Sequence, residues 1–482
     1  MGLNNIFSRG FNNKSNKSAY TPPCIIDDYE EEEVSELEVL PTPEITLDSQ
    51  QEAVVYSTEK NIIVVAGAGS GKTRVLTERI RYLVETLHVP AHNIVSITFT
   101  NMAAEEMKLR LSGVDGIGDA FIGTIHSFAN HIMKESGEKY TLFNDDLDNQ
   151  LHKELIEKYC THLTIDRYLE YKDLKALSDI GKVPQTEVDN FFLPSERSEF
   201  NTLHASAEVV KNDLKEEVHI TFGESIETLC KKRGIITFDE LLIKAKHYFE
   251  KLGASIDYVF VDEFQDVGTL EYNFIRSLSA NNYFFVGDDY QSIYGFKGGN
   301  VEIFLNLVRD DGFTTYFLTN NYRNGAQILK LATNIINQVD KKVEKNIVPI
   351  STFEGEVEVL TRNQLNNVMN KLLHTEKDFK DWFFLTRTNK ELYDVMDMCI
   401  NLGIPYTTFK REGMTLADLN KKKASKKLKI LTVHTAKGLE IDNVILYGNF
   451  PLFLPYYRKN DDERKVMYVG ITRAIKRLII LN

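Results

Sequence analysis

Short apolar runs alternate with amphipathic segments along most of the chain beyond residue 46. Continuous apolar runs of this length are typical of strands that are buried on both faces. They recur at residues 62–65, 94–99, 258–261, 283–286, 315–318, 382–385, 429–433 and 444–447. Helical spacing of apolar residues fills most of the intervals, and strands that alternate with helices pair in parallel. The pattern therefore predicts an α/β fold with parallel sheets.

Two stretches interrupt this alternation. Residues 1–46 lack apolar periodicity and pass from an Asn- and Ser-rich start to an acidic stretch, so we expect a disordered acidic tail. Either it binds a protein partner or mimics DNA, or it only improves solubility. Residues 130–236 are charged, helical and poor in strands, which predicts a helical insertion within the first α/β domain.

Composition narrows the class of protein. A chain of 482 residues with 43% hydrophobic residues can form several globular domains, and no apolar run has the length of a membrane helix. The cysteines at 24, 160, 230 and 399 are widely spaced, which predicts reduced thiols in a cytosolic protein. The net charge of −13 argues against a nucleic-acid partner, but residues 1–46 carry nine acids against three bases. A local basic groove therefore remains compatible with the sequence.

A glycine-rich loop follows the apolar run at 62–65 and precedes a helical segment. Its residues are Ala66, Gly67, Ala68, Gly69, Ser70, Gly71, Lys72 and Thr73. Such a loop between strand and helix surrounds a polyphosphate with backbone N–H groups, with Lys72 on the β- and γ-phosphates and Thr73 on Mg²⁺. Ala66 stands where the first glycine of the usual pattern is expected. A plain glycine turn is the alternative, but the strand–loop–helix context favours nucleoside triphosphate binding.

A second element of a phosphate site ends the run at 258–261. Asp262 is placed to bind Mg²⁺ at the strand end, and Glu263 can orient and deprotonate the attacking water. Phosphoryl transfer also requires positive charge, for which Arg323 and Arg473 are candidates. Both arginines lie in the second half of the chain, so we expect the nucleotide to bind between the two halves. Its binding would close the cleft between them.

A series of segments, in order, resembles the motifs of superfamily 1 helicases of the UvrD/Rep/PcrA type. These segments are residues 47–53, 66–73, 98–104, 123–128, 238–242, 261–266, 286–298, 321–323, 433–440 and 463–474. The resemblance implies two RecA-like parallel-sheet P-loop domains with a helical insertion in the first. It implies the boundaries 47–129 and 237–312 for the first motor domain, 130–236 for the insertion and 313–482 for the second motor domain.

The resemblance also implies roles at the nucleotide. Gln51 and Arg74 would contact adenine, and Tyr322 would stack on the base. Gln291, Arg323 and Arg473 would contact the γ-phosphate, and Glu440 is assigned to nucleotide binding. The implied cofactors are ATP and Mg²⁺.

Single-stranded DNA is usually held by hydrogen-bonding or basic groups on phosphates and by aromatic faces under bases. The resemblance assigns this role to Thr98, Phe99, Thr100, Asn101, His126, Tyr294, Phe296, Lys297, Thr432 and His434. Phe99 is as compatible with a core position as with a base platform. Met102, Phe296 and Lys297 stand where the family has Lys, Trp and Arg, so we expect weaker strand binding.

Larger relatives insert an accessory domain, called 2B, just before the motif at 433–440. Only about two dozen residues separate Tyr406 from Leu431 here, which is too short for a domain. The interval contains a lysine-rich stretch, residues 421–427, that we expect to form a basic loop. It is either a solvated loop or a contact for the DNA backbone.

The sequence thus favours an ATP-dependent DNA helicase and translocase with 3′→5′ polarity implied by the resemblance. Expected partners are single-stranded DNA and duplex junctions, with a possible protein partner at the acidic tail and no membrane, in the cytoplasm of a bacterial or phage-infected cell. One alternative is a helicase-like subunit of a phage replication, recombination or anti-phage defence complex that needs a partner to unwind. A P-loop ATPase unrelated to nucleic acid is the third hypothesis.

Overall fold

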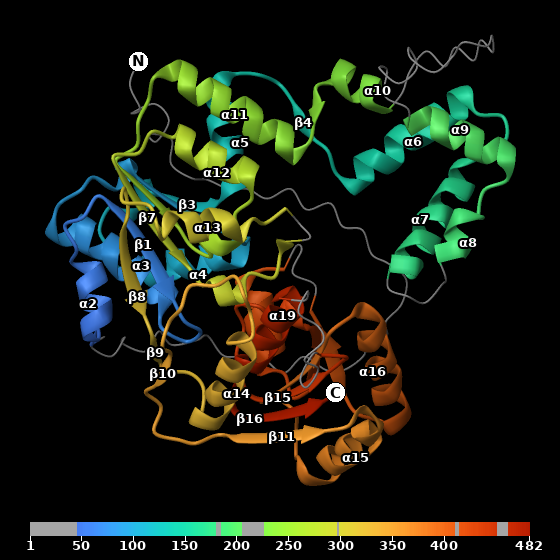
Figure 1. Cartoon of the computed structure of the whole chain (residues 1–482). Helices are drawn as coiled ribbons and strands as arrows, with labels where there is room; N and C mark the ends of the chain where they lie inside the picture. The colour runs from blue at the N-terminus through green and yellow to red at the C-terminus, as the bar shows by residue number, and fades with distance from the viewer. Residues whose placement is uncertain (1–45, 180–184, 205–225, 296–297, 410–413, 451–460) are drawn as a thin grey trace.

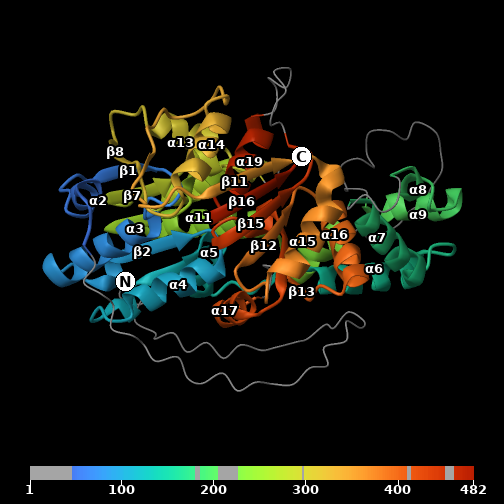
Figure 2. The same cartoon turned by 90° about the horizontal axis from the view of Figure 1, so that it is seen from below.

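The structure is a computed structural model that describes residues 46–179, 185–204, 226–295, 298–409, 414–450 and 461–482. Two six-stranded sheets form its body, and a group of helices extends from one side (Figures 1 and 2). All neighbouring strands in both sheets are parallel, which confirms the predicted α/β fold. None of the helices in these ranges is long and apolar enough to span a bilayer.

The first sheet has the strand order β3-β2-β6-β7-β1-β8. Its strands are β1 (Asn61–Ala66), β2 (Ile94–Thr98), β3 (Phe121–Thr124), β6 (Tyr258–Val261), β7 (Asn282–Gly287) and β8 (Thr314–Leu318). One face packs on α2 (Ser49–Val55), α3 (Lys72–Arg81) and α4 (Asn101–Leu111). The other packs on α5 (Ile125–Ser136), α11 (Phe238–Leu252), α12 (Thr269–Ser277) and α13 (Val301–Leu307). Because the strands are parallel, the polar residues that follow β1, β2 and β6 meet at one edge.

Strand β8 belongs to the first sheet. It pairs with β1 from Ile62 opposite Thr314 to Ala66 opposite Leu318. The start of the second domain predicted at residue 313 is therefore wrong for this strand. An apolar run carries no information about which sheet it joins, and the remaining domain boundaries stay predictions.

The second sheet has the order β11-β16-β15-β12-β14-β13. Its strands are β11 (Glu356–Leu360), β12 (Trp382–Thr386), β13 (Tyr406–Thr408), β14 (Leu428–Thr432), β15 (Ile441–Tyr447) and β16 (Ala474–Leu481). Helices α14 (Ala326–Ile336), α18 (Val433–Ala436) and α19 (Asp461–Ile471) cover one face, and α15 (Leu365–Thr375) and α16 (Asn389–Leu402) cover the other. The first of these cores also contains Ala68, Met102 and Tyr294 from the first half. The two halves therefore share one apolar cluster.

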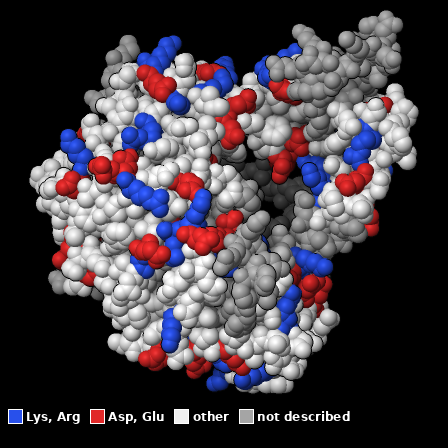
Figure 3. All heavy atoms as spheres, viewed as in Figure 1, with Lys and Arg blue, Asp and Glu red and all other residues white. Residues whose placement is uncertain are grey.

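The extension consists of α6 (Asp145–Tyr159), α7 (Ile165–Asp179), α8 (Gln185–Asp189), α9 (Pro194–His204) and α10 (Ile226–Arg233). It has its own core around Leu151, Leu155 and Tyr168. The short strands β4 (Thr141–Leu142) and β5 (Ile235–Ile236) pair where the chain leaves and re-enters the first half. Figure 3 shows a hollow between these helices and the body, and charges of both signs interspersed over this face. The helical character predicted for this stretch agrees with its described part.

Each of the eight apolar runs overlaps a strand, but the sequence pattern missed four strands of the two six-stranded sheets, one of them the three-residue edge strand β13. β11 alternates charged and apolar residues because it is the edge strand of the second sheet. β3 is short and contains Gly123. β16 carries Lys476 and Arg477 at positions that remain solvent-accessible, which interrupts its apolar run.

The lysine-rich stretch predicted as a loop is largely a helix, α17 (Leu416–Ala424). Thr415 caps it by accepting a hydrogen bond from the backbone N–H of Asp418, and the Asp418 side chain accepts one from the backbone N–H of Thr415. This capping box satisfies N–H groups that a short helix would otherwise leave exposed. Leu419 is buried and anchors the helix. The loop expectation was wrong because the capping residues precede the lysines and only one apolar residue of the helix is buried.

A buried ion cluster joins the segment between α14 and β10 (Val348–Pro349) to the first sheet. Lys345 Nζ donates to Asp288 Oδ1 at 2.6 Å, to Asp289 Oδ1 at 2.7 Å and to the carbonyl of Ala66 at 2.9 Å. All three charged side chains are fully buried. Burial opposes ionisation of Asp288, but the facing ammonium of Lys345 holds its pKa below the usual value. The cluster therefore fixes the ends of β1 and β7.

Lys345→Ala is expected to lower the free energy of unfolding by about 3–5 kcal/mol, because it leaves two buried carboxylates without a cation. Urea denaturation followed by circular dichroism measures the change. Lys341→Ala is the matched control, since Lys341 pairs with Glu302 at the surface, and it should leave the free energy of unfolding nearly unchanged. Equal losses in both variants would contradict the assignment.

Candidate functional site

The glycine-rich loop lies between β1 and the first turn of α3. Gly69 and Gly71 adopt φ values of 63° and 85°, which favour glycine. Gly67 donates its N–H to the carbonyl of Leu318 at 2.8 Å, so the loop begins beside the end of β8. The loop and the helix N-terminus provide the backbone N–H groups that bind anions.

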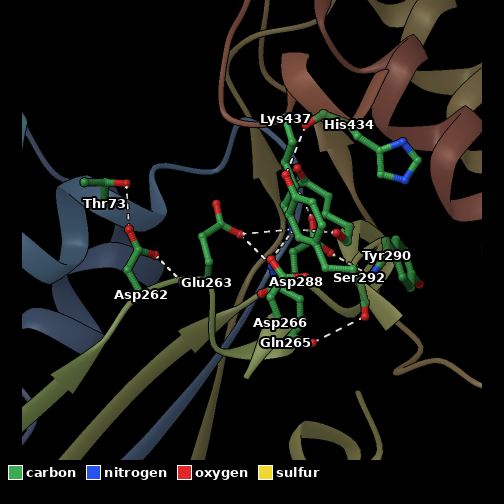
Figure 4. Close-up of polar contacts among 12 residues, drawn as sticks. Thr73, Asp262, Glu263, Gln265, Asp266, Asp288, Tyr290, Ser292, His434 and Lys437 are labelled. Carbon is green, nitrogen blue, oxygen red and sulfur yellow. Dashed lines mark hydrogen bonds and ion pairs between the residues drawn. The ribbon is translucent and has the colours of Figure 1, made fainter. Parts of the chain in front are cut away.

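Thr73 and Asp262 face each other across the strand ends. Thr73 Oγ1 donates to Asp262 Oδ2 at 3.2 Å, and Glu263 donates its N–H to Asp262 Oδ1 at 2.9 Å (Figure 4). Asp262 is buried. Burial, together with the neighbouring charge of Glu263, raises the pKa of Asp262 to about 6. The carboxylate thus lies where a cation beside Thr73 would stabilise it.

Glu263 follows in a left-handed conformation with a φ of 51°. Burial opposes its ionisation, but Lys72 and Lys437 outweigh burial and lower the pKa of Glu263 to about 2. Gln265 Nε2 donates to Glu263 Oε2 at 2.6 Å, which orients the carboxylate. Glu263 is therefore ionised at neutral pH and can accept a proton.

Lys437, which follows α18 in the second half, reaches into the first half. Its ammonium pairs with Asp266, donates to the backbone carbonyl of Gln291 at 2.7 Å and lies 4.0 Å from Glu263 Oε2 (Figure 4). Burial lowers the pKa of an ammonium, but Asp266 and Glu263 outweigh it and raise the pKa of Lys437. This cation connects the two halves directly.

Gln291 and Arg473 form a second connection. Arg473 donates to Gln291 Oε1 at 3.0 Å and to the carbonyl of Leu439 at 3.0 Å, while Gln291 Nε2 donates to Asp288 Oδ2 at 2.6 Å. Burial and the charge of Arg323 lower the pKa of Arg473 to about 9, so the guanidinium stays charged at neutral pH. Two residues that the sequence assigned to the γ-phosphate are thus in contact.

Residues 320–323 also contact the glycine-rich loop. Asn321 Nδ2 donates to the carbonyl of Ala68 at 2.7 Å, and Tyr322 donates its N–H to the carbonyl of Gly69 at 3.0 Å. Arg323 pairs with Glu440, and its buried Nε has no hydrogen-bond partner among the described residues. An orphaned guanidinium nitrogen beside a phosphate-type loop fits an anionic ligand.

The residues that the resemblance assigns to the nucleotide base lie close together around α2. Gln51 Nε2 donates to the carbonyl of Ser70 at 3.1 Å, and Gln51 Oε1 accepts the N–H of Asp48 at 3.2 Å. The hydroxyl of Tyr322 donates to Asp48, and Arg74 donates to the carbonyl of Thr46 at 2.9 Å. Gln51, Arg74 and Tyr322 therefore surround the same end of the loop.

Phe99 and Tyr294 stack with ring centroids 5.1 Å apart and an interplanar angle of 17°. The hydroxyl of Tyr294 donates to the carbonyl of His434 at 3.0 Å, and the two rings are 6.1 Å apart. Burial, then the charge of Arg387, lower the pKa of His434 to about 4, so the imidazole is neutral at pH 7. First-half and second-half residues thus meet at an aromatic pair.

Two adjoining pockets, of about 90 and 230 Å³, lie against this pair, and we call them together the aromatic groove. Both are lined by Thr98, Phe99, Asp262, Asp266 and Tyr294. Acidic residues that follow β6 and aromatic residues assigned to DNA therefore share the same walls.

The other residues assigned to DNA lie at helix starts around the groove. Thr100 caps α4, which begins at Asn101, and Thr432 caps α18. His126 lines the larger pocket and packs edge-on against Phe238 at 5.0 Å. Burial lowers the pKa of His126, so it too is neutral at pH 7. Phe296 and Lys297 lie outside the described residues.

Sequence reasoning gave no role to Asp266, Lys345 and Lys437. Asp266 and Lys437 stand inside segments that resemble known motifs, so motif membership was the available signal. Lys345 lies outside every quoted segment, and nothing in the sequence singled it out.

Gly69→Ala tests how closely the halves pack at the loop. A Cβ at Gly69 would lie 2.6 Å from the Cβ of Arg323, and the positive φ adds strain. We expect a loss of at least about 1–2 kcal/mol in the free energy of unfolding. Gly113→Ala is the control, because its Cβ would meet nothing within 4 Å. Denaturant melts in which both variants match the wild type would refute the close packing.

Comparison with known proteins agrees with this geometry. The family model described as UvrD/REP helicase N-terminal domain matches residues 47–311, and that described as UvrD-like helicase C-terminal domain matches residues 411–482. A probable DNA helicase from Mycoplasma pneumoniae is 27% identical over 90% of this chain and 83% of its own length. ATP-dependent DNA helicases PcrA from Leuconostoc citreum and Staphylococcus epidermidis are each 27% identical over 75% of this chain. The chain spans about half the length of these PcrA proteins, at 49% and 50%. Since the first match alone covers more than half of its residues, this chain belongs to the UvrD/REP helicase family.

Proposed function

We propose that this chain is an ATP-dependent DNA translocase and helicase that hydrolyses ATP between its two halves while it holds a single strand in the aromatic groove. The observation that carries the proposal is the shared wall of the groove. Asp262 and Asp266, at the nucleotide side, line the same pockets as Phe99 and Tyr294. A change at the phosphates therefore has a short path to the strand.

The arrangement accounts for the chemistry of phosphoryl transfer. Lys72 and the loop N–H groups bind the phosphates, and Arg323 and Arg473 supply positive charge from the second half. Glu263 is ionised and oriented by Gln265. It therefore accepts the proton of the attacking water.

The site also fits a divalent cation. Thr73 offers a hydroxyl and Asp262 a buried carboxylate whose pKa is raised to about 6 by burial and by Glu263. Both are hard oxygen ligands of the kind that Mg²⁺ prefers. When bound, Mg²⁺ would neutralise charge on the phosphate oxygens. Thr73 and Asp262 would hold it.

The second half transmits the nucleotide state. Gln291 contacts Arg473 through its side chain and Lys437 through its carbonyl, and Lys437 pairs with Asp266 in the groove wall. Tyr294, three residues after Gln291, contacts His434. ATP would close this interface and hydrolysis would loosen it, which moves the second half along the strand. The resemblance assigns the movement 3′→5′ polarity.

The first test is the rate of ATP hydrolysis with and without oligothymidylate. We expect strong stimulation by the strand, and a loss of about 100-fold or more in Lys72→Ala, because the phosphates lose their cation. A chain lacking residues 1–46 tests the acidic tail in the same assay. Stimulation that appears only without the tail would identify it as an autoinhibitor.

Hydrolysis that is indifferent to DNA in both chains would reject the autonomous motor. Hydrolysis and strand binding without unwinding of a tailed duplex would instead support a helicase-like subunit that depends on a partner.

Phe99→Ala tests the stacking role. Phe99 is 42% exposed, so its truncation should leave the fold intact. We expect oligothymidylate affinity to fall by about 1–3 kcal/mol, as measured by fluorescence anisotropy. Tyr56→Ala, which truncates a 53% exposed aromatic residue at the C-cap of α2, is the control. Unchanged affinity in Phe99→Ala would make Phe99 a packing residue only.

A further inference from the structure

Helix α17 forms part of the wall of the aromatic groove. Leu416 and Leu419 line the smaller pocket together with Phe99, Met102 and Tyr294. The N–H of Leu416 donates to Glu105 of α4 at 2.9 Å, and α17 packs against α4 (Figure 2). This short helix of the second half is therefore docked on the first half beside the proposed strand.

The spacing of residues along α17 places a lysine on the same face as the leucines that line the groove. Residues three, four and seven apart share a face of a helix, so Lys423 continues the row of Leu416 and Leu419. Lys421 is exposed on a different side of the helix, and Lys426 and Lys427 follow the helix end and are exposed. The groove wall thus passes from apolar to cationic along α17.

Some lysines of the second half have side-chain partners and others, such as Lys330, Lys371 and Lys390, have none within the described ranges. Lys341 pairs with Glu302 and Lys476 with Asp442. Lys422 donates to the carbonyl of Thr408 at 2.8 Å and covers the ring of Phe409. Within residues 421–427, the side chains of Lys421, Lys423, Lys426 and Lys427 have neither an ion pair nor a hydrogen bond to the described part of the chain.

Unpaired cations are unexpected here on composition alone. The whole chain has a net charge of −13, yet five lysines fall within seven residues at 421–427. Four ammonium groups without carboxylates repel one another, and a polyanion that follows the groove would relieve that repulsion. A single-stranded nucleic acid is such a polyanion, and its sugar–phosphate backbone is what a groove with a basic border contacts.

We propose that Lys421, Lys423, Lys426 and Lys427 of α17 and its C-terminal turn bind the phosphate backbone of the single strand held in the aromatic groove. The inference rests on the proposed function, because it requires a strand in that groove. It adds a contact surface in the interval where larger relatives insert a domain.

The test is the salt dependence of oligothymidylate binding by the full chain. Each phosphate contact contributes about 0.7 to the slope of log affinity against log salt on a single strand. The variant with Lys421, Lys423, Lys426 and Lys427 all changed to Gln should therefore lose up to about 3 in slope and about tenfold or more in affinity at 0.1 M salt. ATP hydrolysis without DNA should be unchanged.

The control changes four exposed lysines elsewhere to Gln, namely Lys251, Lys330, Lys371 and Lys390. It alters net charge equally, so a comparable loss in both variants would overturn the proposal in favour of a general charge effect. A wild-type slope in the α17 variant would also overturn it, while leaving the proposed function intact. A slope change confined to a blunt duplex would reject the single-strand assignment. If the wild type binds no oligothymidylate at all, the proposed function itself fails.

Discussion

The buried ammonium of Lys437 is the interaction on which the relation between the two halves depends. It comes from the second sheet, pairs with Asp266 and donates to the carbonyl of Gln291 in the first half. Removing such a charge from water costs several kcal/mol unless anions and acceptors surround it. The halves therefore cannot part at this point without either rehydrating Lys437 or carrying Asp266 with it. A two-state interface of this kind favours discrete open and closed positions over gradual sliding.

Lys345 gives the opposite kind of link. It comes from the segment that leads into the second sheet, but its hydrogen bonds to the described residues go to groups at the ends of β1 and β7, and its ammonium lies over the ring of Tyr290. Because these hydrogen-bond partners belong to one sheet, the cluster would stay intact if the halves moved as proposed. Lys437 would then lie at the moving interface and Lys345 at a fixed anchor next to it.

The sequence predicted the fold class and most of the strands because buried parallel strands consist of consecutive apolar residues. It singled out the candidate nucleotide site because glycines, two of which (Gly69 and Gly71) adopt positive φ, and an acidic strand end form a recognisable pattern; the roles of these residues stay predictions. It missed β11, because the exposed edge of a sheet permits charged residues. It predicted β8 as a strand but placed it in the second domain, because tertiary packing decides which strand it pairs with. Lys345 was beyond reach, since a buried lysine cannot be told from a surface one until its partners are known. The helix α17 was missed because its stability comes from its cap and one buried leucine.

The helix cap at Gln51 bears on which base the proposed nucleotide site would accept. The side-chain oxygen of Gln51 accepts a hydrogen bond from the N–H of Asp48, and its side-chain nitrogen donates one to the carbonyl of Ser70. These two hydrogen bonds fix the orientation of the side chain. An amide has two donors and two lone pairs, so one N–H and one lone pair of Gln51 have no hydrogen bond within the described residues. Adenine presents an acceptor and a donor side by side at N7 and N6, whereas guanine presents two acceptors at N7 and O6. A preference for adenine over guanine would then require no further loss of side-chain entropy at Gln51, because the folding of α2 has already ordered this side chain.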